Sequence, residues 1–192
     1  MKLDGMDHRV RVTQELIRKA FTELYIQKPI QSISIKELCE RAGINRGTFY
    51  AHYQDIYDLR DQMQEDMYRD IQQTLSPLLD EDAHASQMEI TVGVFQWMKE
   101  NSDLCAMVLG GFGDKAFLMK VINLGRIVCK DNYLRSFTNA SPERIEWFYA
   151  FASSGCIGLL RKWLLENMET PAREIAGMAE QLIVNGLGYL QG

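Results

Sequence analysis

The chain has 192 residues and a formal net charge of −5 at pH 7, with 46% apolar and 24% charged residues. This balance is typical of a globular protein with a buried core, and it excludes an intrinsically disordered chain. No apolar run reaches the roughly 18 residues of a membrane-spanning helix and no signal-like apolar block begins the chain, so we expect a soluble, cytoplasmic protein.

Apolar residues recur at intervals of three and four along almost the whole chain, which predicts an all-α fold without strands. The spacing predicts a first helix over about residues 10–27. A second helix is expected over residues 35–42, because Ser34 and Glu37 can form a capping box at its start. Gly43 follows it and can adopt the left-handed backbone that ends many helices, so the second helix is short.

The next two helices also have marked starts. Asn45 is a good N-cap for a third helix over residues 46–52, which is stable only if it packs on its neighbour. Asp55 can cap a fourth helix, expected over residues 56–75. The acidic segment 80–86 then predicts a linker or turn.

The remaining sequence predicts five more helices, over about residues 87–100, 103–110, 114–137, 142–167 and 171–188. Two of their starts are well marked. Ser141 precedes Pro142 and Thr170 precedes Pro171, and each pair combines an N-cap with a proline at the first helical position.

A capped short helix, a glycine turn and a second short helix form the pattern of a helix-turn-helix. In this motif the second helix enters the major groove of DNA while the first lies against the backbone. The charge distribution agrees, because residues 1–60 carry a net charge of +2 and the remaining residues a net charge of −7. Any affinity for nucleic acid therefore belongs to the first third of the chain.

Several polar side chains of this motif suit contact with double-stranded DNA. Arg46 can bind guanine or a phosphate, Thr48 offers a hydroxyl and a methyl group, and Gly47 allows close approach of the backbone. A solvated helix face is the alternative, but it leaves the glycine turn unexplained. The expected DNA-binding residues are Ser34, Lys36, Asn45, Arg46, Gly47, Thr48, Tyr50, His52 and Tyr53, although Tyr53 can also face the small core with Ile44 and Phe49.

The segment ISIKELCERAGINRGTFYAHYQDIYDL resembles the DNA-binding segment of the TetR family of bacterial regulators, and the resemblance covers about residues 10–60. It carries the family's Ala-Gly-Val/Ile and Tyr-x-x-Phe/Tyr elements. The resemblance implies an all-helical homodimer that binds a DNA operator. One departure is Ile56, because family members usually have a phosphate-contacting Lys there; Arg9 and Arg11 could compensate.

The segment FYAFASSGCIGLLRKWLLENMETPAREIAGMAEQL, over about residues 147–182, is similar to the last two helices of a TetR subgroup common in Firmicutes. Gly155 and Gly158 lie inside a predicted helix, where each costs about 1 kcal/mol relative to Ala. Close approach of helices at a dimer interface is the expected reason, and space for a ligand is the alternative. The expected interface residues are Gly155, Gly158, Trp163 and Leu182.

The family resemblance also implies an effector pocket in the C-terminal part. We expect it to be lined by large apolar side chains, namely Trp97, Met107, Phe112, Phe117, Phe148 and Phe151. Aromatic and Met residues at helical spacing are often simply core, which is the alternative for each of them.

Catalytic and metal-binding patterns are missing from the sequence. His8, His52 and His84 are scattered, and there is no HExxH helix, nucleophile elbow or phosphate-binding glycine loop. We therefore expect no enzyme, no cofactor and no metal. The four cysteines lack CxxC spacing and suit reduced packing residues, with a disulfide between Cys105 and Cys129 as the alternative.

These observations together predict a sequence-specific DNA-binding regulator. We expect a three-helix DNA-binding domain over residues 1–55, joined by a long helix to a helical effector-binding and dimerisation domain within residues 56–192. The expected action is repression that is released by a small-molecule effector. The alternatives are a regulator or activator controlled by a protein partner, and a helical interaction adaptor.

Overall fold

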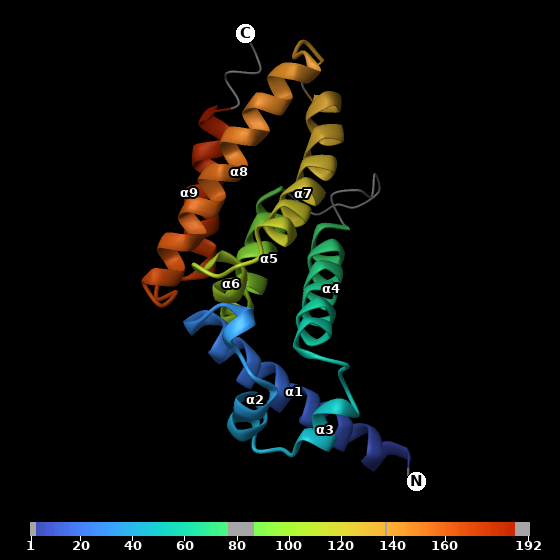
Figure 1. Cartoon of the computed structure of the whole chain (residues 1–192). Coiled ribbons are helices and arrows are strands. Elements are labelled where there is room, and N and C mark those ends of the chain that lie inside the picture. The colour runs from blue at the N-terminus through green and yellow to red at the C-terminus, as the bar shows by residue number, and fades with distance from the viewer. Residues whose placement is uncertain (1–2, 77–86, 137, 187–192) are drawn as a thin grey trace. The chain divides into compact units, whose positions relative to one another are not determined.

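A computed structural model describes the backbone of residues 3–76, 87–136 and 138–186, and the side chains of residues 8–76, 92–127 and 138–186. Every regular element in these ranges is a helix, which confirms the predicted all-α fold (Figure 1). The chain divides into two compact units. The first comprises Met1–Met67 with Asp103–Asp114, and the second comprises Tyr68–Ser102 with Lys115–Gly192.

The first unit contains α1 (Leu3–Gln27), the 3-10 turn η1 (Ile30–Ser32), α2 (Ile35–Ala42), α3 (Arg46–Tyr50), the first part of α4 (Ile56–Leu75) and most of α6 (Ser102–Leu109). Its core is built around the fully buried side chains Ile17, Phe21, Leu24, Leu38, Phe49 and Leu59. Ile17, Phe21 and Leu24 recur along α1 at intervals of three and four, which is the spacing seen in the sequence. The short helices α2 and α3 are held by burial of Leu38 and Phe49 rather than by their own stability.

Local side-chain caps set the starts of α2, α3 and α4. Ser34 Oγ accepts the Glu37 backbone N–H at 3.2 Å, and Asn45 Oδ1 accepts that of Thr48 at 2.8 Å. Asp55 Oδ1 accepts the backbone N–H of Tyr57 at 2.7 Å. All three caps confirm the predicted helix starts, because each satisfies an amide that the helix itself leaves without a partner.

Gly43 ends α2 with φ of +68°, in the left-handed region, as its position predicts. Two boundaries in this unit differ from the sequence-based expectation. α1 begins at Leu3 rather than near residue 10, and α3 ends at Tyr50, so that His52 lies in the turn that follows. Neither difference has a local capping signal in the sequence.

The second unit contains the end of α4, together with α5 (Gln87–Glu100), α7 (Lys115–Ser136), α8 (Pro142–Leu165) and α9 (Ala172–Gly186). α9 packs on α5 and α8, and α7 packs on α8. Ser141 caps α8 by accepting the Arg144 backbone N–H at 3.3 Å. α9 begins one residue later than predicted, and the carbonyl of Pro171 accepts the backbone N–H of Ile175 at 3.2 Å.

Cysteines and possible membrane helices complete the description of the fold. Cys39 and Cys156 are free thiols, and burial raises the pKa of the buried Cys105 thiol to about 12. The side chain of Cys129 lies outside the described residues, so the disulfide alternative is not tested. None of the described helices is both long and apolar enough to span a membrane.

Candidate nucleic-acid interface and apolar pocket

The α2–turn–α3 segment presents a polar face because its apolar side chains are used in the core. Phe49 is fully buried, and its ring lies 5.8 Å from that of the buried Tyr53. These two rings fix the rotation of the five-residue α3. The opposite side of the short helix therefore carries exposed Arg46 and Tyr50, and the Tyr50 side chain is 56% exposed.

Arg46 is the cation best placed to meet a ligand on this face. Among the described residues it has no hydrogen bond and no ion pair, whereas Lys36 at the start of α2 lies 3.8 Å from Glu40 and is itself exposed. A cation without an intramolecular partner can bind phosphate or a guanine edge without first breaking a contact. Ser34, Asn45 and Gly47 are exposed beside it, and Thr48 and His52 are half-buried.

Eight of the nine predicted DNA-binding residues therefore lie on one short segment with at least part of their surface exposed. That they bind DNA stays a prediction. Ser34 and Asn45 have an additional structural role, since their side-chain oxygens cap α2 and α3. Only their remaining lone pairs and the exposed helix N-termini are left for a phosphate or a base.

Tyr53 requires a correction. Only 1% of its surface is exposed, and its hydroxyl accepts a hydrogen bond from Arg18 Nε at 3.3 Å. Arg18 also donates through Nη2 to Asp66 Oδ2 at 2.6 Å. Tyr53 thus belongs to the core alternative that the sequence left open, and it supports α3 from beneath instead of contacting a ligand.

Ion pairs hold most of the other charged side chains around this segment. Lys28 Nζ lies 2.6 Å from Glu37 Oε2, and this bond from Lys28 lowers the pKa of the Glu37 carboxyl below its ordinary value. Arg41 lies 2.9 Å from Glu23. The side chain of Ile56, which replaces the lysine usual in the resembled family, is buried at the start of α4 and offers no charge to a phosphate.

The second unit holds a cavity of about 250 Å³, which we call the effector cavity after the role that we propose for it. Its lining includes Ile71, Thr74 and Leu75 of α4, Trp97 of α5, Ile122 and Gly125 of α7, Tyr149, Ala152, Ser153 and Cys156 of α8, and Ile183 of α9. No lining residue among those described carries a formal charge at neutral pH. Burial also raises the pKa of the Cys156 thiol, so this group stays neutral.

Three of the described lining residues carry hydroxyl groups, and backbone carbonyls accept a hydrogen bond from each of them. The Tyr149 hydroxyl donates to the Ile122 carbonyl at 2.7 Å, Thr74 donates to Asp70 at 2.9 Å, and Ser153 donates to Ala150 at 3.3 Å. These oxygens keep lone pairs that can accept a hydrogen bond. The cavity is thus apolar with a few weak polar groups, as small-molecule sites commonly are.

The side chain of Tyr149 passes so close to α7 that residue 125 has no room for a Cβ atom. A Cβ atom at Gly125 would lie 2.7 Å from the Tyr149 hydroxyl, closer than non-bonded atoms approach. The absence of a side chain at this point of α7 lets Tyr149 reach the Ile122 carbonyl, and both residues form part of the cavity lining.

The large side chains predicted to line one pocket are in fact divided among several places. Trp97 lines the effector cavity, and its contact with an effector stays a prediction. Met107 and Phe112 belong to the first unit, and Phe117 is buried without lining the cavity, so these three assignments were wrong. Large apolar side chains fill space, whereas small ones such as Ala152, Ser153 and Cys156 leave it. Ala152 and Ser153 precede Cys156 by four and three residues on α8, and this helical spacing of small residues was the available signal.

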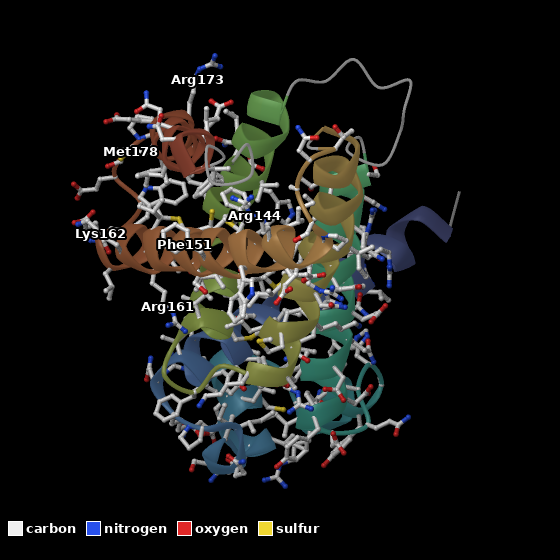
Figure 2. The ribbon with its side chains drawn as sticks, turned by 90° about the horizontal axis from the view of Figure 1, so that it is seen from above. Arg144, Phe151, Arg161, Lys162, Arg173 and Met178 are labelled. Carbon is white, nitrogen blue, oxygen red and sulfur yellow. The ribbon has the colours of Figure 1, made fainter. Side chains whose placement is uncertain are left out.

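Phe148 and Phe151 line a second cavity of about 330 Å³ between α8 and α9, which we call the α8–α9 groove. Its outer rim is apolar and exposed, with 75% of Phe151 and 63% of Leu182 accessible. Figure 2 shows Phe151 on α8 and Met178 on the neighbouring α9. A Cβ at Gly155 or Gly158 would meet no atom within 4 Å, so both glycines lie open within the chain.

Trp163 does not share this exposure, and its assignment to an interface was wrong. Its ring is 1% exposed and lies 6.0 Å from the ring of Phe95, and its indole N–H donates to the Thr170 carbonyl at 3.0 Å. Trp163 is therefore a core residue that ties the end of α8 to α5 and to the turn before α9.

Comparison with protein families accounts for most of the chain. The family described as "Transcriptional regulator C-terminal region" matches residues 86–185, and the family described as "Bacterial regulatory proteins, tetR family" matches residues 17–63. The second match contains the α2–turn–α3 segment. The first contains most of the effector cavity and all of the α8–α9 groove lining except Gly186. None of the curated proteins compared matches the sequence.

Solved structures share the fold at low sequence identity. NalD, the secondary repressor of the MexAB-OprM multidrug efflux pump in Pseudomonas aeruginosa, is 18% identical with a TM-score of 0.66, over 92% of this chain and 97% of its own. FadR from Bacillus subtilis, solved with stearoyl-CoA, is 12% identical with a TM-score of 0.66, over 90% and 98%. The dihydroxyacetone kinase operon activator DhaS is 15% identical with a TM-score of 0.60, over 92% and 96%.

These structural likenesses show the fold, and the family matches show the relationship. The capped α2, the glycine turn and the exposed face of α3 fall inside one match, and more than half of the chain falls inside the other. The chain belongs to the TetR family of bacterial transcriptional regulators, and it is a DNA-binding regulator of transcription.

Proposed function

We propose that the protein is a repressor whose dimer holds an operator through α2 and α3 and releases it when a small neutral compound enters the effector cavity. The observation that carries this proposal is the cavity itself, which is uncharged along its described lining and contains residues of α4. The relative NalD, described as a repressor, has the same fold. We propose the cytoplasm as the place of action, because bacterial operator DNA lies there, and we expect no catalytic activity.

The cavity supports a particular class of effector. An apolar cavity of about 150 Å³ is known to hold benzene, so about 250 Å³ suits a compound of one or two rings. A charged group would lose its hydration without gaining an ion pair there. A neutral compound avoids this cost, and the described lining favours it because it is largely apolar. This is a smaller and less polar ligand than the stearoyl-CoA bound to FadR.

Release of the operator requires that the effector prefer one conformation, since equal affinity for two states shifts no equilibrium. α4 is the element that supports such a preference. It starts directly after the α3 turn at the Asp55 cap, and its residues Ile71, Thr74 and Leu75 line the effector cavity. We therefore propose residues 1–55 as the DNA-binding part and residues 56–192 as the effector-binding and dimerisation part.

An activator controlled by a protein partner is the second candidate. The observation that favours it is the exposed apolar rim of the α8–α9 groove, with Phe151 and Leu182, which a protein could cover. The relative DhaS is described as an operon activator. Transcription from the operator in the absence and presence of the regulator separates the two, because a repressor lowers it and an activator raises it.

The test of the proposed function starts from DNA fragments of the regulator's own promoter region and those of its neighbouring genes. We expect at least one fragment to bind far more tightly than random duplex of the same length at the same salt concentration. A panel of neutral one- and two-ring compounds should then include one that releases it. Equal affinity for every fragment would refute operator recognition, and release only by charged compounds would refute the effector class.

A further inference from the structure

Two cavities of the second unit are separated by a single layer of side chains. The effector cavity and the α8–α9 groove are both lined by Ala152, Cys156 and Ile183, which we call the shared wall. The methyl group of Ala152 and the thiol of Cys156 are small. A group that packs against the outer side of the shared wall therefore also restricts the motion of its inner side, where the effector would lie.

The outer side is an open apolar surface in the isolated chain. Phe151 and Leu182 stand at the rim of the groove with 75% and 63% of their surface exposed, and Gly155 lines it without a neighbour beyond its own helix. Exposed apolar patches of this kind mark interaction sites on folded proteins. Members of this family act as dimers, so a second copy is available to cover the groove.

A second copy is the occupant that fits best, because one face supplies both the protruding group and the recess. In a two-fold interface the same patch meets itself, so Phe151 of each copy can enter the groove of the other. A cavity of 150 Å³ accepts a benzene ring, and the groove offers about 330 Å³ for the phenyl ring. The missing side chains at Gly155 and Gly158 allow the two copies of α8 to approach closely.

We propose that Phe151 of a second copy fills the α8–α9 groove and supports the shared wall, so that the effector site is complete only in the dimer. This inference rests on the proposed effector cavity. Without that ring, Ala152, Cys156 and Ile183 face an unfilled space on their outer side. Side chains without packing partners on one side lose dispersion contacts and move more easily. A cavity lined by such side chains binds a ligand with lower affinity.

The experiment uses the neutral two-ring fluorescent probe 6-propionyl-2-dimethylaminonaphthalene with the full chain. Leu182→Arg places a charge at the groove rim and should give a folded monomer that binds the probe at least tenfold more weakly than the parent. Phe151→Ala should remain largely dimeric and lose several-fold in probe affinity. Val184→Arg is the matched control. Val184 is exposed on α9 without lining the groove, and two residues of a helix differ by about 200°, so this variant should match the parent.

Light scattering gives the oligomeric state, and circular dichroism with urea unfolding shows whether each variant is folded. A folded Leu182→Arg monomer that binds the probe as tightly as the parent would overturn the inference and leave the effector cavity standing. A Leu182→Arg protein that stays dimeric would also overturn it, since the groove would then face something other than a second copy. A parent dimer that takes up no probe would refute the effector class itself and this inference with it.

Discussion

Arg18 and Asp66 join α1 to α4 through a 2.6 Å contact between Nη2 and Oδ2, and the same guanidinium donates through Nε to the hydroxyl of Tyr53. Both ion-pair side chains are partly exposed, whereas Tyr53 is buried. One side chain thus links α1, the turn after α3 and α4. The orientation of α3 within the first unit therefore depends on side chains that do not belong to the exposed face of α3.

Tyr53→Phe removes only the hydroxyl of this arrangement. We expect it to lower the free energy of unfolding by about 0.5–1.5 kcal/mol, the usual net value of one hydrogen bond, and to change operator affinity little. Tyr50→Phe should leave the free energy of unfolding nearly unchanged and weaken operator binding, because the Tyr50 side chain is 56% exposed on the α3 face. Urea unfolding and fluorescence anisotropy with an operator duplex measure the two quantities. A large loss of operator affinity in Tyr53→Phe, without such a loss in Tyr50→Phe, would show that Tyr53 contacts DNA after all.

Arg46→Ala should weaken operator binding by about 1–3 kcal/mol, the value typical of an arginine that contacts a base. Stability should hardly change, since Arg46 makes no hydrogen bond or ion pair within the described part of the chain. Lys162→Ala on α8 removes the same charge from the other unit and serves as the control. Titrations at several salt concentrations will show whether Arg46 contacts phosphate. Losing one phosphate contact reduces the slope of log affinity against log salt concentration by about one. Parent affinity in Arg46→Ala would refute the assignment of α3.

Gly43→Ala should destabilise the protein by about 1–2 kcal/mol, because Gly43 has φ of +68° and left-handed backbone is unfavourable for residues with a Cβ. The cost is purely conformational, since a Cβ there would meet no atom within 4 Å. Gly43→Asn should recover part of the loss, because asparagine tolerates this conformation better. Urea unfolding of the three proteins gives the order, and an alanine variant as stable as the parent would contradict the turn geometry.

Gly125→Ala and Gly93→Ala place the same methyl group on two helices with different surroundings. At Gly93 the Cβ meets nothing within 4 Å, so the helix should gain about 0.5–1 kcal/mol. At Gly125 the Cβ would lie 2.7 Å from the Tyr149 hydroxyl, so Tyr149 must move and lose its bond to Ile122. The helical gain should then be cancelled and probe binding in the effector cavity should fall. Equal stabilisation and unchanged binding in both variants would contradict the packing of Tyr149.

Acid should weaken the first unit through Glu37. Its pKa lies below the ordinary 4.5 in the folded state, chiefly because Lys28 bonds to the carboxylate. A lowered pKa stabilises the fold above the unfolded value of about 4.5, and this contribution is lost as pH falls through the folded value. Urea unfolding from about pH 6 to about pH 3 should therefore show a flatter profile for Glu37→Gln than for the parent. Lys28→Met should flatten it likewise, and a parent-like slope in both variants would exclude this pair as a source of acid sensitivity.

Much of the helical fold was predictable because its signals are local. Ser34, Asn45, Asp55 and Ser141 cap helices through bonds to residues two or three positions away, which a sequence displays directly. The start of α1 at Leu3 has no such cap in the sequence, and the prediction missed it. A boundary without a local signal depends on the rest of the structure.

Positions of large apolar side chains were less predictable, since helical spacing tells which residues are buried but not against what. Met107 and Phe112 belong to the first unit although they lie in the middle of the chain, and only tertiary contacts decide this. Tyr53 follows the end of α3, where the helical period no longer indicates which side it faces. Ala152 and Ser153 belong to a run of small residues for which space for a ligand was only the alternative interpretation, and both line the effector cavity. The prediction chose large apolar side chains instead, although a cavity arises where side chains are small.

Hybrid regulators, made by grafting the DNA-reading part of one family member onto another, face a constraint in this chain. Asp103–Asp114 belong to the same compact unit as Met1–Met67, and Gln64 donates to Asp114 at 3.3 Å. A graft of residues 1–67 alone would leave that unit to be completed by a foreign segment in place of the buried Met107 and Val108. A graft should therefore carry both Met1–Met67 and Asp103–Asp114. Alternatively, it should replace only exposed side chains of α3, which leaves the packing between these two segments unchanged.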